Sequence, residues 1–310
     1  MSIDNSVDKG GGKSGHLILI ASMVLMGTAY VSAKFALRVT EPFTTAFFRF
    51  LIASLVMWPI LFGLKLKQTI RKEHAGLLIR HALFHTTFYF ALQYTGMQFT
   101  STTNTALITN TRPIILALLA VIFLRERFSI IQWGALLLAF AGVVLILRDP
   151  YANFVPTHLR GDFLILLTAV SGALGIMFLK QLLEHYHPFT ILVYQATIGM
   201  FGLLPLALYE RGGYLFAGEI AWIPIIYMAV FLTFGSQVLL NVGLSKLPVS
   251  VSGVYLFLVP AASVVYAYFL LDEPVTWRLV IGGLLILTGT YVINNKDKFS
   301  FKKRRADPIN

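Results

Sequence analysis

The chain has 310 residues, of which 57% are hydrophobic and 13% charged, with a net charge of +11 and no cysteine. Soluble domains carry about 25% charged residues, so this composition excludes that class, and the missing cysteines exclude disulfides and thiolate metal sites. We therefore expect an integral membrane protein.

Ten apolar windows follow one another along the chain, each close to the roughly 20 residues that a helix needs to cross a bilayer. The predicted transmembrane helices are 16–38, 42–63, 75–97, 102–124, 130–148, 160–182, 189–209, 221–244, 249–271 and 275–294. A flexible N-terminus (1–15) and a basic tail (295–310) flank them. The predicted fold class is an all-α integral membrane protein.

The first window also has features of a secretory signal, since residues 31–33 (Val-Ser-Ala) resemble a cleavage site. However, Lys34 near its end matches Lys180 near the end of the sixth window, which lies far from the N-terminus. This match favours a first window that stays in the fold. Both lysines lie close enough to helix ends to reach the membrane interface.

The two halves of the chain repeat each other at a spacing of 147 positions. The repeat pairs Gly96 with Gly243, Pro113 with Pro260, Glu126 with Glu273, and Gly142 with Gly289. Each copy contains five windows. Because an odd number of crossings ends on the opposite side of the bilayer, the second copy enters it inverted. The predicted domains are repeats at 16–148 and 160–294. Inverted repeats are typical of secondary transporters, whose site lies between the halves.

Lysine and arginine gather in the loops on the side that holds both termini. The positive-inside rule therefore predicts cytoplasmic termini in a plasma or inner membrane. The basic run Lys302–Arg305 is interpreted as a contact with lipid headgroups, and no nucleic-acid partner is expected.

Glu126 and Glu273 each fall where one predicted helix ends and the next begins. After Glu126, Ser129 and Gln132 fit a capping box, and Glu273 precedes a proline suited to a first helical position. Both glutamates are therefore predicted to be structural caps. Glycines in the fifth and tenth windows allow close helix packing, within one chain or across a homodimer.

Four stretches of the first half carry a family resemblance: 113–120 (Pro-Ile-Ile-Leu-Ala-Leu-Leu-Ala), 124–127 (Leu-Arg-Glu-Arg), 132–137 (Gln-Trp-Gly-Ala-Leu-Leu) and 141–144. They resemble the EamA domain of the drug/metabolite transporter superfamily. The second copy is similar but departs from it at 272–274 and at Val280. The resemblance implies a ten-helix transporter with a cavity between its halves. It also implies export of amino acids or other metabolites.

Polar side chains inside the windows are candidates for a substrate site, because hydrocarbon makes them costly. The predicted substrate-binding residues are His81, His85, Tyr89, Asn104, Asn110, Arg112, Gln237, Asn241 and Tyr255. Arg112 is the strongest candidate, since no carboxylate lies deep in any window. Its alternative partners are backbone carbonyls. Arg49 is a further cavity candidate.

Other roles stay open for several of these groups. The amides also suit hydrogen bonds between helices, and the histidines also suit neutral hydrogen-bonded positions. If His81 and His85 titrate, protons would be the coupling ion. Pro113 and Pro260 fall near the centres of their windows, where we expect kinks that act as matched hinges.

The leading hypothesis is a secondary transporter that exports a small polar metabolite, an amino acid or related carboxylate, by alternating access. Arginine binds carboxylate in a bidentate fork. The alternative is a carrier of organic anions or of phosphorylated or sugar metabolites. A membrane-embedded enzyme is disfavoured, because no HExxH or GxSxG motif is present. No catalytic residue, cofactor or metal is expected.

Overall fold

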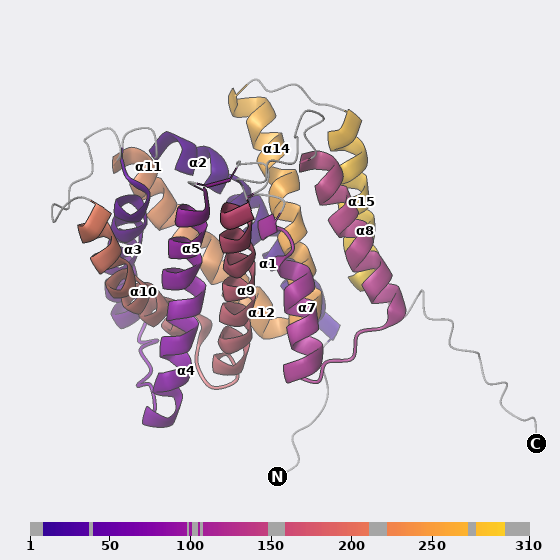
Figure 1. The fold of residues 1–310 in the computed structure, drawn as a ribbon. Coiled ribbons are helices and arrows are strands. Elements are labelled where there is room, and N and C mark those ends of the chain that lie inside the picture. The colour runs from indigo at the N-terminus through magenta and orange to yellow at the C-terminus, as the bar shows by residue number, and fades with distance from the viewer. Residues whose placement is uncertain are drawn as a thin grey trace, which may run out of the picture.

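A computed structural model gives the fold and describes residues 9–36, 40–97, 99–100, 105, 108–147, 159–210, 222–271 and 277–294. This part of the chain is helical and contains no strand. Its helices pack side by side into a bundle (Figure 1).

Helices occur in all ten predicted windows. The first half contains α1 (Lys9–Gly27), α2 (Ala29–Ala36), α3 (Pro42–Gly63), α4 (Lys72–Ala82), the π-helical η1 (Leu83–Thr87), α5 (Phe88–Met97), α7 (Arg112–Phe123) and α8 (Ile130–Leu147). The second half contains α9 (Leu159–Leu182), α10 (Pro188–Glu210), α11 (Trp222–Tyr227), the π-helical η4 (Met228–Ser236), α12 (Gln237–Lys246), α13 (Val249–Val254), the 3-10 segment η5 (Tyr255–Phe257), α14 (Leu258–Leu271) and α15 (Trp277–Asn294).

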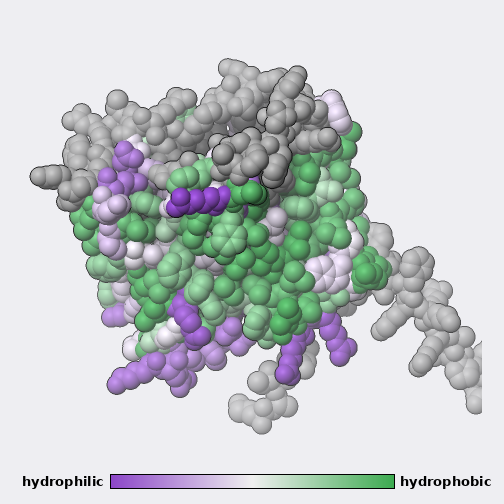
Figure 2. Space-filling model, viewed as in Figure 1, coloured by the Kyte–Doolittle hydropathy of each residue, from purple (hydrophilic) through white to green (hydrophobic). Residues whose placement is uncertain are grey.

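The apolar helices identify a multi-pass membrane protein. Among the described residues, four helices are long and apolar enough to cross a bilayer: Pro42–Gly63, Leu159–Leu182, Pro188–Glu210 and Trp222–Lys246. Shorter apolar helices cover Ser14–Gly27, Arg112–Phe123, Ile130–Leu145 and Val280–Ile293. Figure 2 shows the matching surface, a broad apolar band with hydrophilic residues gathered along its lower edge. The count of ten spans stays a prediction.

The main contacts of the bundle join one half of the chain to the other. Helix α3 packs along α10, and α8 packs along α15. Helix α5 contacts α9, while α12, the repeat equivalent of α5, contacts α1. In the same way α7 contacts α9, and α14 contacts α1. Each of these contacts is therefore accompanied by its counterpart under the sequence repeat.

Glycines make the closest of these contacts possible. A Cβ atom on Gly142 would lie 2.5 Å from the carbonyl oxygen of Gly282, and one on Gly289 would lie 2.5 Å from that of Ala135. Ala135 and Gly282 are themselves 147 positions apart. The α8–α15 pair thus uses the same two positions from each side, and its backbones approach too closely for a larger residue.

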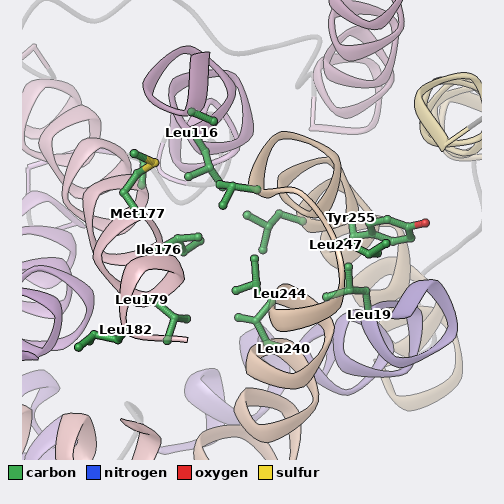
Figure 3. Close-up of a cluster of buried hydrophobic side chains, with 14 of the residues drawn as sticks. Leu19, Leu116, Ile176, Met177, Leu179, Leu182, Leu240, Leu244, Leu247 and Tyr255 are labelled. Carbon is green, nitrogen blue, oxygen red and sulfur yellow. The ribbon is translucent and has the colours of Figure 1, made fainter. Parts of the chain in front are cut away.

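A buried apolar cluster fills the space between the halves. Its members include Leu19 of α1, Leu116 of α7, Ile176 of α9, and Leu240 and Leu244 of α12. Figure 3 shows these side chains pointing toward one another from their four helices. The cluster therefore joins both halves next to the cavity described below.

The structure corrects the expected position of Pro113. The residue lies in the first turn of α7 and not in the middle of a continuous helix. Before it the chain turns, with the amide of Thr111 donating to the carbonyl of Ile108 at 2.9 Å. A proline costs little at this position because first-turn amides have no partner within the helix. Pro260 is the third residue of α14, directly after the 3-10 segment η5.

The capping box before α8 is confirmed. The amide of Ser129 donates to Gln132 Oε1 at 3.0 Å, and the amide of Gln132 donates to Ser129 Oγ at 3.3 Å. Glu126 has a different contact, because its Oε1 accepts from the amide of Val249 at 2.9 Å, where α13 begins. Glu273 lies outside the described residues.

Lys180 binds the same corner of the second half. Its Nζ donates to the carbonyls of Leu244 and Leu247 at 2.7 and 2.8 Å, at the end of α12. Glu126 and Lys180 therefore hold the two sides of the α12–α13 corner.

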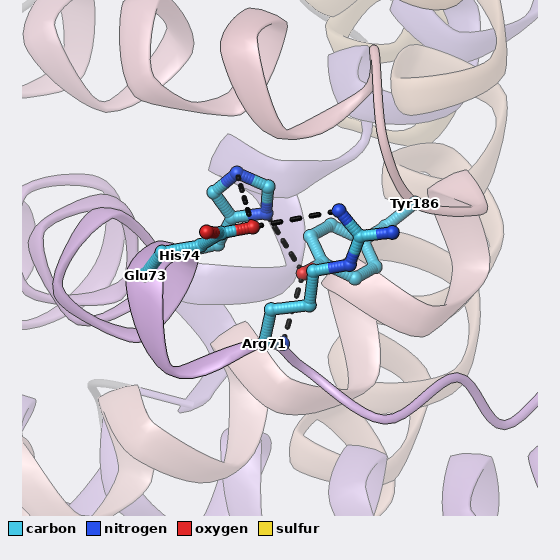
Figure 4. Close-up of polar contacts among 4 residues, drawn as sticks. All are labelled: Arg71, Glu73, His74 and Tyr186. Atoms are coloured by element: carbon cyan, nitrogen blue, oxygen red, sulfur yellow. Dashed lines mark hydrogen bonds and ion pairs between the residues drawn. The ribbon is translucent and has the colours of Figure 1, made fainter.

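A group of polar contacts joins the start of α4 to the loop after α9 (Figure 4). The amide of Arg71 donates to the Tyr186 hydroxyl at 3.0 Å, and that hydroxyl lies 2.9 Å from His74 Nδ1. Since the hydroxyl accepts from Arg71, it is free to donate to His74. The exposed Glu73 adds little, because surface ion pairs contribute about 0–1 kcal/mol.

We predict that Gly142→Ala destabilises the protein, because the new methyl group meets a backbone carbonyl in α15. Overpacking of this kind costs about 1–3 kcal/mol, which a lower melting temperature in detergent would reveal. Gly134→Ala is the matched control, since the same helix leaves open space at that position. Equal melting temperatures for the two variants would contradict the close approach of α8 and α15.

Candidate functional site

A cavity of about 200 Å³ lies between the two halves. This volume is below the roughly 300–1,000 Å³ of pockets for drug-sized ligands, so it suits a small molecule. Among the described residues, its polar lining consists of Arg49, His85, Tyr89, Gln93, Tyr94, Thr105, Thr109, Asn110, Arg112, Gln195, Thr233 and Gln237. The described lining thus contains two guanidinium groups and no carboxylate.

Arg112 enters the cavity from the first residue of α7. Its guanidinium carbon lies 5.6 Å from the centre of the Tyr89 ring, and its buried Nε has no hydrogen-bond partner among the described residues. A Cβ atom on Gly172 of α9 would lie 2.9 Å from Arg112 Cδ and 3.0 Å from the Tyr89 ring. A glycine at this position therefore leaves room for both side chains.

Arg49 enters the cavity from α3. Its Nε donates to Thr233 Oγ1 of η4 at 2.6 Å. Its guanidinium carbon lies 5.6 Å from the centre of the Phe50 ring and 5.5 Å from that of Phe90. Cation–π contacts of this type contribute more when they are shielded from water.

Three further lining residues have buried polar atoms without a partner in the described chain. These atoms are His85 Nδ1, Thr109 Oγ1 and Gln237 Oε1. An unsatisfied buried group costs about 1–3 kcal/mol, so such atoms are suited to bind a ligand. His85 lies in η1 and Thr233 in η4, and segments of π-helix are frequent at functional sites.

His81 lies outside the cavity lining and is completely buried. Its Nδ1 lies 2.8 Å from the carbonyl oxygen of Gly175, which can only accept, so Nδ1 donates. Its Nε2 lies 3.0 Å from the side-chain amide of Gln195. The same amide lies 3.2 Å from the Thr86 hydroxyl, so Gln195 bridges His81 and Thr86. These bonds join α4 to α9 and α10.

Asn241 and Tyr255 also lie outside the lining, and both are buried. Asn241 Nδ2 donates to the carbonyl of Pro188 at 3.4 Å. The Tyr255 hydroxyl lies 2.6 Å from His16 Nδ1. These contacts join α12 to α10 and η5 to α1.

The cavity thus brings together five of the residues predicted from the sequence: His85, Tyr89, Asn110, Arg112 and Gln237. Asn104 lies outside the described residues. A binding function for any of them stays a prediction.

The cavity lining also contains Gln195 and Thr233, which were not predicted from the sequence, and Arg49, which was only a further candidate. A signal was present, because Arg49 and Gln195 are repeat counterparts at a spacing of 146 positions, and both are polar within apolar windows. Thr233 has the counterpart Thr86, at a spacing of 147. Matched polar positions in the two halves would have marked these residues.

Comparison with known proteins gives a consistent result. The model of the EamA-like transporter family matches residues 13–148 and 159–295. The uncharacterized transporter YetK of Bacillus subtilis is 27% identical over 289 residues, covering 91% of this chain and 87% of that protein. An uncharacterized transporter of Archaeoglobus fulgidus is 28% identical over 284 residues, covering 90% and 98%.

A plant protein and a solved structure extend the comparison. The WAT1-related protein At3g02690, chloroplastic, of Arabidopsis thaliana is 26% identical over 89% of this chain and 68% of that protein. One chain in a crystal structure superposes with a TM-score of 0.80 at 16% identity, covering 91% of this chain and 99% of that one. That structure therefore has the same fold.

We predict that substituting His81 mainly lowers stability and that substituting His85 mainly lowers transport. His81→Leu leaves Gly175 and Gln195 without their partner, so unfolding should become easier by about 1–3 kcal/mol. His85→Leu removes no hydrogen bond from Nδ1, so it should change the melting temperature less and reduce transport more. Melting curves and flux for the two purified variants test this. A larger loss of stability for His85→Leu would contradict it.

Proposed function

This chain belongs to the EamA-like transporter family of the drug/metabolite transporter superfamily, and we propose that it exports a small metabolite carrying a carboxylate, an amino acid or related acid. The observation that carries the proposal is Arg112, whose guanidinium lines the cavity and whose Nε has no partner in the part of the chain that the structure describes. A ligand carboxylate supplies the missing charge and accepts in a bidentate fork. Outward transport rests on the family resemblance alone.

The proposed architecture is ten transmembrane helices in two inverted repeats, 16–148 and 160–294, in the plasma membrane with both termini cytoplasmic. Paired contacts support it: α5 packs on α9 as α12 packs on α1. The glycine contacts of α8 and α15 support it further, since Gly142 meets Gly282 and Gly289 meets Ala135. Such reciprocal contacts are expected of two halves related by a two-fold axis.

The proposed mechanism is alternating access, in which the halves rock around a site between them. Irregular helical segments at repeat-equivalent places support it. The π-helical η1 corresponds to part of η4, and the turn before α7 corresponds to the 3-10 segment η5. Pro113 and Pro260 lie in the first turns of the helices that follow the second pair of irregular segments, and we assign them the role of hinges.

A second candidate function is the transport of organic anions. One observation favours it, namely that Arg49 joins Arg112 in a described lining without a carboxylate. A cavity with two positive charges attracts a ligand with more than one negative charge.

The decisive measurement is uptake of labelled amino acids, organic acids and sugars into proteoliposomes, with and without a proton gradient. We expect uptake of a carboxylate, and Arg112→Gln should reduce it at least about tenfold, because a bond to a charged group is lost. Arg80→Gln is the matched control, since Arg80 is exposed and lies outside the cavity lining. Equal uptake by wild type and Arg112→Gln would rule out the proposed role of Arg112.

We expect Pro113→Ala to lower the transport rate more than ligand affinity, because it changes the turn before α7 and removes no polar lining atom. Flux and equilibrium binding of the same labelled ligand test this. An unchanged rate in both Pro113→Ala and Pro260→Ala would count against the hinges.

A further inference from the structure

We propose that the substrate carries two separate carboxylates, one bound by Arg112 and the other by Arg49, so that it is a small dicarboxylate. This inference rests on the proposed function, because it takes the cavity to be the substrate site. It goes further by giving each arginine its own anionic group.

The positive charge of the cavity lining favours a ligand with two negative charges. Arginine keeps its proton inside proteins, so Arg49 and Arg112 place two positive charges on the lining. Neither guanidinium forms an ion pair within the described part of the chain. Charges buried without partners are costly, and a ligand with two negative charges neutralises both.

Nearby acids already have partners at helix ends. Glu210 accepts from the amides of Phe43 and Thr44 at the start of α3, at 3.2 and 2.9 Å. Glu126 accepts from the start of α13. None of the described acids lines the cavity, and the proposed ligand would supply the counter-charge.

The two guanidiniums have different contacts within the protein. Arg112 lies over Tyr89 and packs against Gly172 of α9, while Arg49 lies over Phe90 and donates to Thr233 of η4. The Tyr89 and Phe90 rings are 5.2 Å apart and nearly perpendicular, at 78°. The two guanidiniums therefore reach the cavity from different helices, and each lies over its own aromatic ring. Two carboxylates joined by a short carbon chain match this arrangement.

The same arrangement disfavours an amino acid with a single carboxylate. Its ammonium group would enter a cavity with two like charges and no described carboxylate to pair with it. The unpaired Gln237 Oε1 is a neutral acceptor, which suits a ligand hydroxyl and only weakly offsets that repulsion.

The experiment is a cycle that removes one carboxylate from the ligand and one arginine from the protein. Affinities of succinate, butyrate, aspartate and a phosphate monoester are measured on the purified full chain in detergent. Wild type should bind succinate at least about tenfold more tightly than butyrate, because one bond to a charged group is lost. In Arg49→Gln this preference should disappear, while butyrate affinity stays unchanged. Arg80→Gln should retain the wild-type preference.

Several results would overturn the inference. Equal affinity for succinate and butyrate in wild type would leave a one-carboxylate site, with the proposed function intact. Tighter binding of aspartate than of succinate would contradict the argument against an ammonium group. Tighter binding of the phosphate monoester, lost on changing either arginine, would mean that both guanidiniums bind one group.

Failure of the proposed function has a different signature, because no carboxylate would then bind or be transported, whether or not Arg112 is present. If Arg49→Gln does not fold, Arg49→Lys replaces it in the experiment. Lysine keeps the positive charge but cannot bind a carboxylate with two parallel hydrogen bonds. The succinate-to-butyrate ratio in wild type tests the inference without any variant.

Discussion

The structure depends on one constraint: inside a bilayer, polar groups must find their partners within the protein. Helices satisfy their own backbone, and charged side chains satisfy the helix ends, as Glu210 does at α3 and Lys180 at α12. His81 is satisfied by a carbonyl on one side and an amide on the other. The polar atoms left over in the described cavity lining belong to His85, Thr109, Arg112 and Gln237. They are the atoms at which the proposed ligand would complete the hydrogen bonding.

The contacts between helices use equivalent residues in the two halves. Close approach in lipid depends on small residues, and the chain uses them at equivalent positions of its two halves. Gly96 lies against Gly161 and Ile165, and Gly243 lies against Leu19. One set of contacts therefore stabilises two interfaces. The halves differ at other positions that line the cavity, such as Arg112 and its counterpart Val259.

The sequence predicted every helical window, because a long apolar run has few alternatives in a membrane. It did not predict where helices break, because Pro113 suits a first turn as well as a kink. It also could not separate His81 from His85. Both lie on one polar stripe at a spacing of four, and the π-helical segment η1 and the position of Gly175 decide which ring reaches the cavity. Arg49 was ambiguous because its neighbours Phe90 and Thr233 are far away in the sequence.

The corner between α12 and α13 has a consequence for any rocking of the halves. Glu126 holds one side of it and Lys180 the other, through three hydrogen bonds to backbone groups. Both side chains bind the same short stretch of chain, so moving this stretch away from them would break these bonds. Under the rocking mechanism proposed above, the corner is expected to stay attached to the helix ends that carry Glu126 and Lys180.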